Sequence, residues 1–173
     1  MTESMSKDRL RPSLLDRLTD RQPERQVERG QEQAVNEAQL RSLLRRDLTW
    51  LFNATRPASF GPDIDLAQHP EVQRSVLNFG IPALTGRTLS SVQVEELEQS
   101  VTQALCWFEP RLIAESLQVR VLKGSREFGA AALVFDIEAE MWAEPLPLRL
   151  HLRSEVDLES GRVAIHDTVR EER

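Results

Sequence analysis

The triplet Glu109, Pro110 and Arg111 follows two aromatic residues, Trp107 and Phe108, where an apolar helical pattern ends. A carboxyl group beside aromatic rings could be the general acid of a glycoside hydrolase, which needs an apolar pocket to keep it protonated. Proline cannot continue the first helix but suits the first turn of a new one, so a second helix is predicted to start at Pro110. Glu109 would then lie at a helix N-terminus, where the helix dipole favours the ionised carboxylate and not the acid.

A binding surface is the alternative interpretation of the same triplet. Residues i and i+2 of an extended or bent segment point the same way, so Glu109 and Arg111 are expected to project together beside Trp107 and Phe108. Arginine next to an aromatic ring is a common interface anchor, because guanidinium stacks on rings and pairs with carboxylates. Glu109 and Arg111 could also pair only with each other, which contributes little when the pair is exposed.

Histidine and cysteine give little support for a metal or redox centre. The chain has three histidines, which lie far apart without the i, i+4 spacing that places two ligands on one helix face, so no metal site is predicted. The single cysteine, Cys106, lies in an apolar run and is expected to be buried and unreactive. The sequence has no phosphate-binding loop, dinucleotide fingerprint or nucleophile elbow, so no cofactor is expected.

A row of acidic residues at two-residue spacing is a second source of carboxylates for hydrolysis. The same spacing is typical of the solvated face of a strand whose charges lie across from basic residues on its neighbour. We favour this second interpretation. The acidic residues are Asp136, Glu138 and Glu140, and the basic ones are Arg149, His151 and Arg153.

Three helices are predicted before any strand. The first begins after Asn36 and ends before Pro57, with leucines on one stripe and Arg41, Arg45 and Asp47 facing outward. The stripe consists of Leu40, Leu44, Leu48 and Leu51.

The second helix is predicted to start at Pro70 and to be capped by Gly80. The third is predicted to open with a capping box, Ser90 and Gln93, and to end near Phe108. The inner face of the second helix is predicted to hold Val72, Val76 and Phe79.

After the third helix the hydrophobic period changes to two, which is typical of strands. Four such runs, joined by short turns, predict an antiparallel meander. Helices followed by strands indicate an α+β fold, in which the N-terminal helices pack on one face of a four-stranded, mostly antiparallel sheet. The runs cover residues 117–121, 133–141, 146–158 and 163–165.

Residues 1–36 are charged and poor in apolar side chains, so we expect a flexible arm ahead of a single domain over residues 37–170. Within the arm, residues 13–18 (SLLDRL) are an exception, because Ser13 can cap one helical turn. That turn would present leucines to a partner, although a disordered tail with chance leucines is an equal alternative. The leucines are Leu14, Leu15 and Leu18.

Net charge and hydropathy restrict the classes of partner that the protein is expected to bind. Lys and Arg number 22 against 28 Asp and Glu, a net charge of −6, which disfavours a nucleic-acid partner. The N-terminal residues carry charges throughout, and no stretch approaches the about 20 apolar residues that a membrane span needs. A cytoplasmic protein without membrane insertion is therefore predicted.

The order of five segments resembles a known family. These segments are SLLDRL, LRSLLRRDLTWLFNATR, HPEVQRSVLNFGIPALTG, FEPRL and DLESGRV. They resemble TssE, the baseplate wedge subunit of bacterial type VI secretion systems, a family similar to a contractile-phage wedge protein traditionally labelled lysozyme-like. The match runs from about Ser13 to Val163, and the pairing of SVLNFG with FEPRL is specific to the family.

The resemblance implies a structural part of a contractile injection machine and not an enzyme. It implies that Glu109, Pro110 and Arg111 contact the wedge core bundle formed by TssF and TssG, with TssK in the same assembly. The family fold is also similar to the domain through which sheath subunits interlace strands, which implies a role in starting the TssB and TssC sheath. The baseplate would dock at the inner-membrane complex. The lysozyme-like label keeps a peptidoglycan-cleaving glycoside hydrolase as the alternative.

Overall fold

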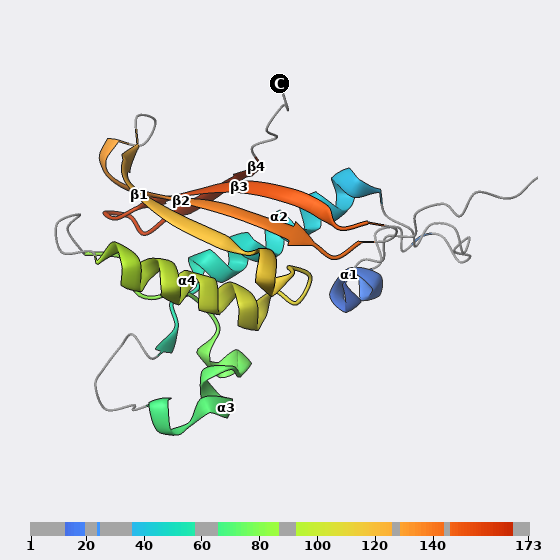
Figure 1. Cartoon of the computed structure of the whole chain (residues 1–173), viewed down its shortest axis with the longest axis horizontal. Coiled ribbons are helices and arrows are strands. Elements are labelled where there is room, and N and C mark those ends of the chain that lie inside the picture. Colours follow the sequence, from blue (N-terminus) through green and yellow to red (C-terminus); the bar gives the residue numbers. More distant parts are fainter. Residues whose placement is uncertain are drawn as a thin grey trace, which may run out of the picture.

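The computed structural model describes residues 13–19, 24, 36–57, 66–86, 93–125, 129–143 and 146–167. Within these ranges, helices precede a four-stranded antiparallel sheet, which confirms the predicted α+β fold (Figure 1). The α-helices are α1 (Leu14–Leu18), α2 (Glu37–Asn53), α3 (Pro70–Gln73) and α4 (Val94–Phe108). The strands are β1 (Gln118–Ser125), β2 (Gly129–Met141), β3 (Leu148–Asp157) and β4 (Val163–Asp167). Single 3-10 turns cover Leu66–Gln68, Val76–Asn78 and Ala114–Ser116.

Helix α2 forms as its sequence pattern predicts. Asn36 and Gln39 make a reciprocal capping box, which satisfies two backbone N–H groups at the helix start. The predicted leucine stripe is buried, and the helix ends at Asn53, before Pro57. Helix α2 thereby presents one apolar face to the sheet.

Helix α4 is the second long helix under the sheet. It begins at Val94, with Gln93 as its N-cap residue and no capping hydrogen bond from that side chain. The predicted partner in the capping box, Ser90, lies outside the described residues. The buried positions recur at helical spacing and are Leu97, Val101, Ala104 and Leu105.

The strands follow one another in the order β1-β2-β3-β4, each pair antiparallel. The register confirms the predicted pairing of charges across two strands, with Asp136 opposite Arg153, Glu138 opposite His151 and Glu140 opposite Arg149. The face of β2 that packs on the helices holds Leu133, Phe135, Ile137, Ala139 and Met141.

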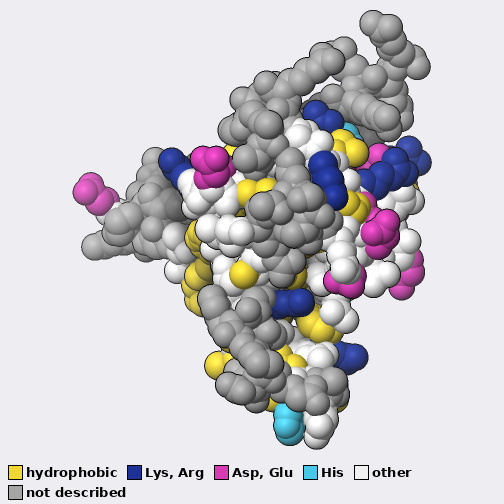
Figure 2. Space-filling model, turned by 90° about the vertical axis from the view of Figure 1, so that its left-hand side faces the viewer, with side chains coloured by type: hydrophobic (Ala, Val, Ile, Leu, Met, Phe, Trp, Pro, Cys, Tyr) yellow, Lys and Arg dark blue, Asp and Glu magenta, His cyan; other side chains and the backbone are white. Residues whose placement is uncertain are grey.

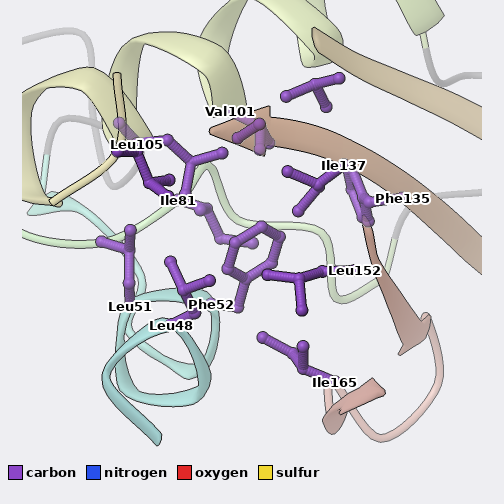
Figure 3. Packing of buried hydrophobic residues seen from close by; sticks show 14 of the residues in the cluster. Leu48, Leu51, Phe52, Ile81, Val101, Leu105, Phe135, Ile137, Leu152 and Ile165 are labelled. Atoms are coloured by element: carbon purple, nitrogen blue, oxygen red, sulfur yellow. The ribbon is translucent and has the colours of Figure 1, made fainter. Parts of the chain in front are cut away.

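The core lies between the two long helices and the sheet. Figure 3 shows side chains of α2 and α4 meeting those of β2, β3 and β4. The rings of Phe52 from α2 and Phe135 from β2 meet edge to face at its centre, with centroids 5.8 Å apart. Ile81, which comes from a loop, joins the same cluster.

The segment around Gly80 pairs with the chain that leaves α2. Ile81 donates to the carbonyl of Ala54 and accepts from the N–H of Arg56, at 2.9 and 3.0 Å. Gly80 has a φ of 126°, and a Cβ there would collide with the carbonyl oxygen of Ala54. Only glycine fits this crossing without strain.

The prediction of one continuous helix from Pro70 to Gly80 is wrong. Helix α3 ends at Gln73 and a separate 3-10 turn follows, so the spacing of a continuous helix does not apply. Val72 and Val76 are therefore exposed, at 40% and 81%, whereas Asn78 is buried and donates to the carbonyl of Gln73. Figure 1 shows this segment lying away from the sheet.

Candidate functional site

Glu109 lies at the end of α4 and not at the start of another helix. It is the C-cap residue, and its N–H donates to the carbonyl of Leu105 at 2.9 Å. The next segment is drawn to the sheet, because Ile113 donates to the carbonyl of Glu140 at 2.8 Å and Leu112 bridges to Met141. The predicted helix beginning at Pro110 is therefore wrong, and a single 3-10 turn, Ala114–Ser116, stands in its place.

A carboxylate at a helix C-terminus faces the negative end of the helix dipole, which is unfavourable. Arg111 offsets this cost. Its Nε lies 2.7 Å from Oε1 of Glu109, its Nη2 lies 2.6 Å from Oε2, and its backbone N–H donates to Oε1 at 3.2 Å. Glu109 is 4% exposed. The two side chains do project together, as predicted, but toward each other and not into solvent.

The pair belongs to a longer series of ion pairs of alternating sign, which we call the ion-pair chain. Arg111 Nη2 lies 2.7 Å from Oδ2 of Asp47 on α2, and Oδ1 of Asp47 lies 2.6 Å from Nη2 of Arg46. Arg46 Nη1 in turn lies 2.7 Å from Oδ1 of Asp16 on α1. The ion-pair chain thus runs from Glu109 through Arg111, Asp47 and Arg46 to Asp16.

Pairing within the ion-pair chain shifts the pKa values of Arg111 and Asp16 toward their ionised forms. Burial alone would lower the pKa of Arg111, but its hydrogen bonds and charge contacts with Glu109 and Asp47 raise that pKa above its usual value. Burial raises the pKa of Asp16, but hydrogen bonds from Ser13 and Arg46 outweigh it and leave the pKa of Asp16 below its usual value. Mutual pairing therefore stabilises the ionised forms.

Helix α1 has the predicted local structure. Ser13 caps it by accepting from the N–H of Asp16 at 3.3 Å, and the Ser13 hydroxyl donates to the Asp16 carboxylate at 2.6 Å. The Asp16 side chain is 3% exposed, so this residue faces the body of the protein. The three leucines of α1 face solvent, with exposed fractions of 68% for Leu14, 54% for Leu15 and 74% for Leu18.

The two aromatic residues before Glu109 are half-buried. Phe108 packs on the core and meets the ring of Phe79 edge to face, with centroids 5.3 Å apart, and Trp107 meets Phe108 at 6.3 Å. This contact joins the segments SVLNFG and FEPRL in space. Within the described ranges, the guanidinium of Arg46 lies over the ring of Trp50, 4.8 Å from its centroid.

The sequence interpretation missed three members of the ion-pair chain, Asp16, Arg46 and Asp47. Asp47 was assigned to the outward face of its helix, and no local pattern marks its contact with Arg111, 64 residues away. The one sequence signal that could have pointed to Asp16 was its position among the leucines of α1. The long-range contacts come from the tertiary arrangement.

Cys106 is exposed, so the prediction that it is buried is wrong. It lies on the outer side of α4, between the buried positions Ala104 and Leu105 and the half-buried Trp107. Desolvation by its neighbours and the charge of Glu115 raise the pKa of its thiol, which lowers the fraction of reactive thiolate.

One group of potential metal ligands comes together across β2 and β3. Nε2 of His151 lies 3.0 Å from Oδ1 of Asp136 and 3.8 Å from Oε1 of Glu138. One ligand atom from each residue can lie within 4.8 Å of the others. The strand register brings these residues together as it does the other charge pairs of this face.

The geometry around Glu109 does not suit acid catalysis. A general acid needs an environment that favours its protonated form, whereas Arg111 pairs with both carboxylate oxygens of Glu109. Figure 2 shows acidic and basic side chains intermixed on one flank of the molecule. Among the described helices, none combines the length and apolar character needed to span a bilayer. The site is best suited to holding segments of protein together.

Comparison with known proteins places the chain in a class that this fold and site suit. The family model of baseplate wedge protein gp25 matches residues 38–146. The chain therefore belongs to the baseplate wedge protein gp25 family, whose members are structural subunits of phage-tail-like baseplates. No curated protein and no solved structure matches it. The matched range contains α4, the Glu109–Arg111 turn and all of α2 except its first residue, Glu37.

Proposed function

We propose that the chain is a wedge subunit of a type VI secretion baseplate, of the TssE kind. It binds the core bundle of TssF and TssG, with TssK in the same assembly, and helps to start the TssB and TssC sheath. The protein acts in the cytoplasm, in a baseplate docked at the inner-membrane complex. Membership of the gp25 family supports the baseplate role, and the resemblance of SLLDRL and DLESGRV, which lie outside the matched range, supports the secretion-system assignment.

One observation carries the proposal for the partner-binding surface. Two of the five segments that carry the resemblance, α1 and the Glu109–Arg111 turn, are 90 or more residues apart, and the ion-pair chain joins them. Short helices are marginal alone, so a helix of five residues needs such an anchor. An anchored α1 presents its leucines in a fixed orientation, which lowers the ordering entropy lost on binding.

We assign different roles to the residues of this surface. Leu14, Leu15 and Leu18 make apolar contact with the wedge core bundle, since exposed apolar patches mark interaction sites. Pro110 is exposed and borders the partner, together with the half-buried Trp107 and Phe108. Glu109 and Arg111 stabilise the turn. Through Asp47 they also help to hold α1 against the body of the protein.

Binding of a purified TssF–TssG complex tests the proposal. Replacing both Leu14 and Leu18 with alanine is expected to weaken binding at least tenfold, because truncation removes apolar contact area without removing core residues. Leu122→Ala, which truncates an exposed leucine on β1, is the matched control and should bind like the wild type. Deletion of residues 1–12 should leave binding unchanged. Equal binding by the leucine variant and the wild type would refute the docking role of α1.

Two variants separate the residues that orient the partner-binding surface from the residues that contact the partner directly. Arg111→Ala is expected to lower both the thermal stability and the affinity, whereas the leucine variant should lower the affinity alone. If Arg111→Ala binds normally at temperatures where it is folded, the turn does not orient the partner-binding surface.

A further inference from the structure

A histidine and two carboxylates come together on the face of the sheet that lies opposite the two long helices. Phe135 and Ile137 of β2 pack in the core, so Asp136 and Glu138, which alternate with them, lie on the other face. His151 of β3 is the cross-strand neighbour of Glu138 and shares that face. β2 and β3 are the two inner strands of the sheet (Figure 1). All three polar side chains are half-buried.

The three side chains converge more closely than the strand geometry requires. Residues i and i+2 of a strand are about 6.6 Å apart, yet one donor atom from each of Asp136, Glu138 and His151 lies within 4.8 Å of the other two. The register places His151 opposite Glu138, but its Nε2 is nearer to Oδ1 of Asp136, at 3.0 Å against 3.8 Å to Oε1 of Glu138. Two carboxylates this close repel each other unless positive charge lies near both.

One oxygen of this cluster is buried without a hydrogen bond. Within the described ranges, Oδ1 of Asp136 accepts none, although the side chain as a whole is 19% exposed. A buried polar atom of this kind needs another partner, such as water or an ion. Nε2 of the neutral imidazole can carry a lone pair, which repels an oxygen 3.0 Å away unless a proton or a metal ion lies between them. A cation would satisfy both atoms.

The distances suit a small divalent cation. Zn²⁺ binds imidazole nitrogen and carboxylate oxygen at about 2.0 to 2.2 Å, so two ligand atoms of a tetrahedral site lie about 3.4 Å apart. The distances of 3.0 and 3.8 Å fall on either side of that value. Two carboxylates also neutralise the charge of the ion. Arg120 and Arg153, the cross-strand neighbours of Asp136, are exposed, so solvent screens their charge.

We propose that Asp136, Glu138 and His151 form a binding site for Zn²⁺. The imidazole nitrogen favours Zn²⁺ over Mg²⁺ and Ca²⁺, which prefer oxygen ligands alone. Three protein ligands leave the fourth tetrahedral position to water, which reaches the half-buried cluster. The ion links β2 to β3 through their side chains and stabilises the folded sheet. A sequence search for histidines at i, i+4 misses this site, because its ligands come from two strands.

Calorimetric titration of Zn²⁺ into the protein without an affinity tag tests the site. The wild type is expected to bind one equivalent, and His151→Ala and Asp136→Asn should each bind at least tenfold more weakly. His166→Ala is the matched control, because His166 is exposed on the same face but lies outside the cluster. Cys106→Ser, which removes an exposed thiol, is a second control. Both controls should bind Zn²⁺ like the wild type.

Two outcomes of the titration would overturn the proposal. One is the absence of binding by the wild type. The other is a loss of affinity in His166→Ala or Cys106→Ser that equals the loss in His151→Ala, which would indicate adventitious binding to surface groups only. Melts without metal show which variants are folded, and Asp136→Asn, which keeps the shape of the side chain, serves if His151→Ala is unfolded.

The melting temperature and the visible spectrum give independent readouts. An ion that binds only the folded protein stabilises it by mass action, so Zn²⁺ at a hundredfold excess over its Kd should raise Tm by about 5 °C. Mg²⁺ at the same concentration should leave Tm unchanged. Co²⁺ should show the visible absorption of a tetrahedral site in the wild type and in His166→Ala, and lose it in His151→Ala. An equal rise in Tm with Mg²⁺, or one that persists in both His151→Ala and Asp136→Asn, would overturn the zinc site.

Discussion

The rings of Phe79 and Phe108 meet edge to face with their centroids 5.3 Å apart, and this contact joins the end of the Val76–Asn78 turn to the end of α4. Phe79 precedes the Gly80 crossing, and Phe108 is the last residue of α4. The contact fixes the end of α4, and with it the turn that carries Glu109 and Arg111. This aromatic contact therefore helps to hold in place one end of the ion-pair chain.

The Phe79–Phe108 contact is expected to show measurable coupling. Aromatic pairs of this geometry contribute about 1 kcal/mol beyond the area that they bury. A double-mutant cycle of Phe79→Leu and Phe108→Leu, followed by urea unfolding, should give a coupling free energy of that size. Additive effects of the two substitutions would show that the rings pack independently.

Gly80→Ala should be strongly destabilising. Its positive φ disfavours any side chain, and a Cβ would collide with the backbone of Ala54, so a loss of at least about 3 kcal/mol is expected. Gly86→Ala is the control, because Gly86 also has a positive φ, 78°, but its Cβ would meet no atom of the described residues within 4 Å. That variant should lose only about 1 kcal/mol. Similar losses of stability in the two variants would show that the backbone at Ala54 moves to make room for the added Cβ.

Arg111→Ala should reduce the free energy of unfolding by roughly 2 to 3 kcal/mol. It leaves the 4% exposed Glu109 without its guanidinium partner at a helix C-terminus, and an uncompensated buried charge is costly. Arg149→Ala removes an arginine that is 85% exposed, and its loss should stay below about 0.5 kcal/mol. Chemical denaturation compares the two variants. Equal and small losses of stability in the two variants would mean that the Glu109 carboxylate becomes hydrated when Arg111 is removed.

The attachment of α1 should depend on pH through Asp16. The folded-state pKa of Asp16 lies below its usual value, because hydrogen bonds from Ser13 and Arg46 outweigh burial. The stabilisation is therefore complete above the usual carboxyl pKa of about 4 and is lost as the pH falls through the lower folded value. Attachment should be constant from about pH 5 to 8 and weaken below about pH 4.

The fluorescence of Trp50, which lies under the guanidinium of Arg46, is one probe of this attachment. Because the other tryptophans also emit, the titration is best done with Trp107 and Trp142 replaced by phenylalanine. Asp16→Asn should show the detached signal already at pH 7 and no further change in acid down to about pH 4. A wild-type transition near neutral pH would be inconsistent with a lowered pKa at Asp16.

The protein should release no reducing sugar from purified peptidoglycan. Glu109 faces a guanidinium and not an apolar pocket, so it is not available as a general acid. Hydrolysis by the wild type that disappears in Glu109→Gln would contradict this expectation, provided that thermal melts show the variant to be folded. Such a result would restore the glycoside hydrolase alternative.

The sequence by itself determined the fold class, the two long helices, the four strands and the start of α1. Periodicity of 3.6 located α2 and α4, periodicity of two located the four strands, and Ser13 marked the start of α1, because each of these signals is written in neighbouring residues. The pairing of acidic and basic rows across β2 and β3 was also predictable, since short turns fix the register of adjacent strands.

Only the tertiary structure decided what Glu109 and Arg111 contact. Asp47 is 64 residues from Arg111, and Asp16 is 30 residues from Arg46. An outward-facing charge on an isolated helix has the same local pattern whether it meets solvent or another segment. The helix expected at Pro110 does not form for a similar reason, because the N–H of Ile113 donates to the carbonyl of Glu140 on β2. Which charges meet depends on how α1, α2 and α4 are packed, and packing is set by the whole core.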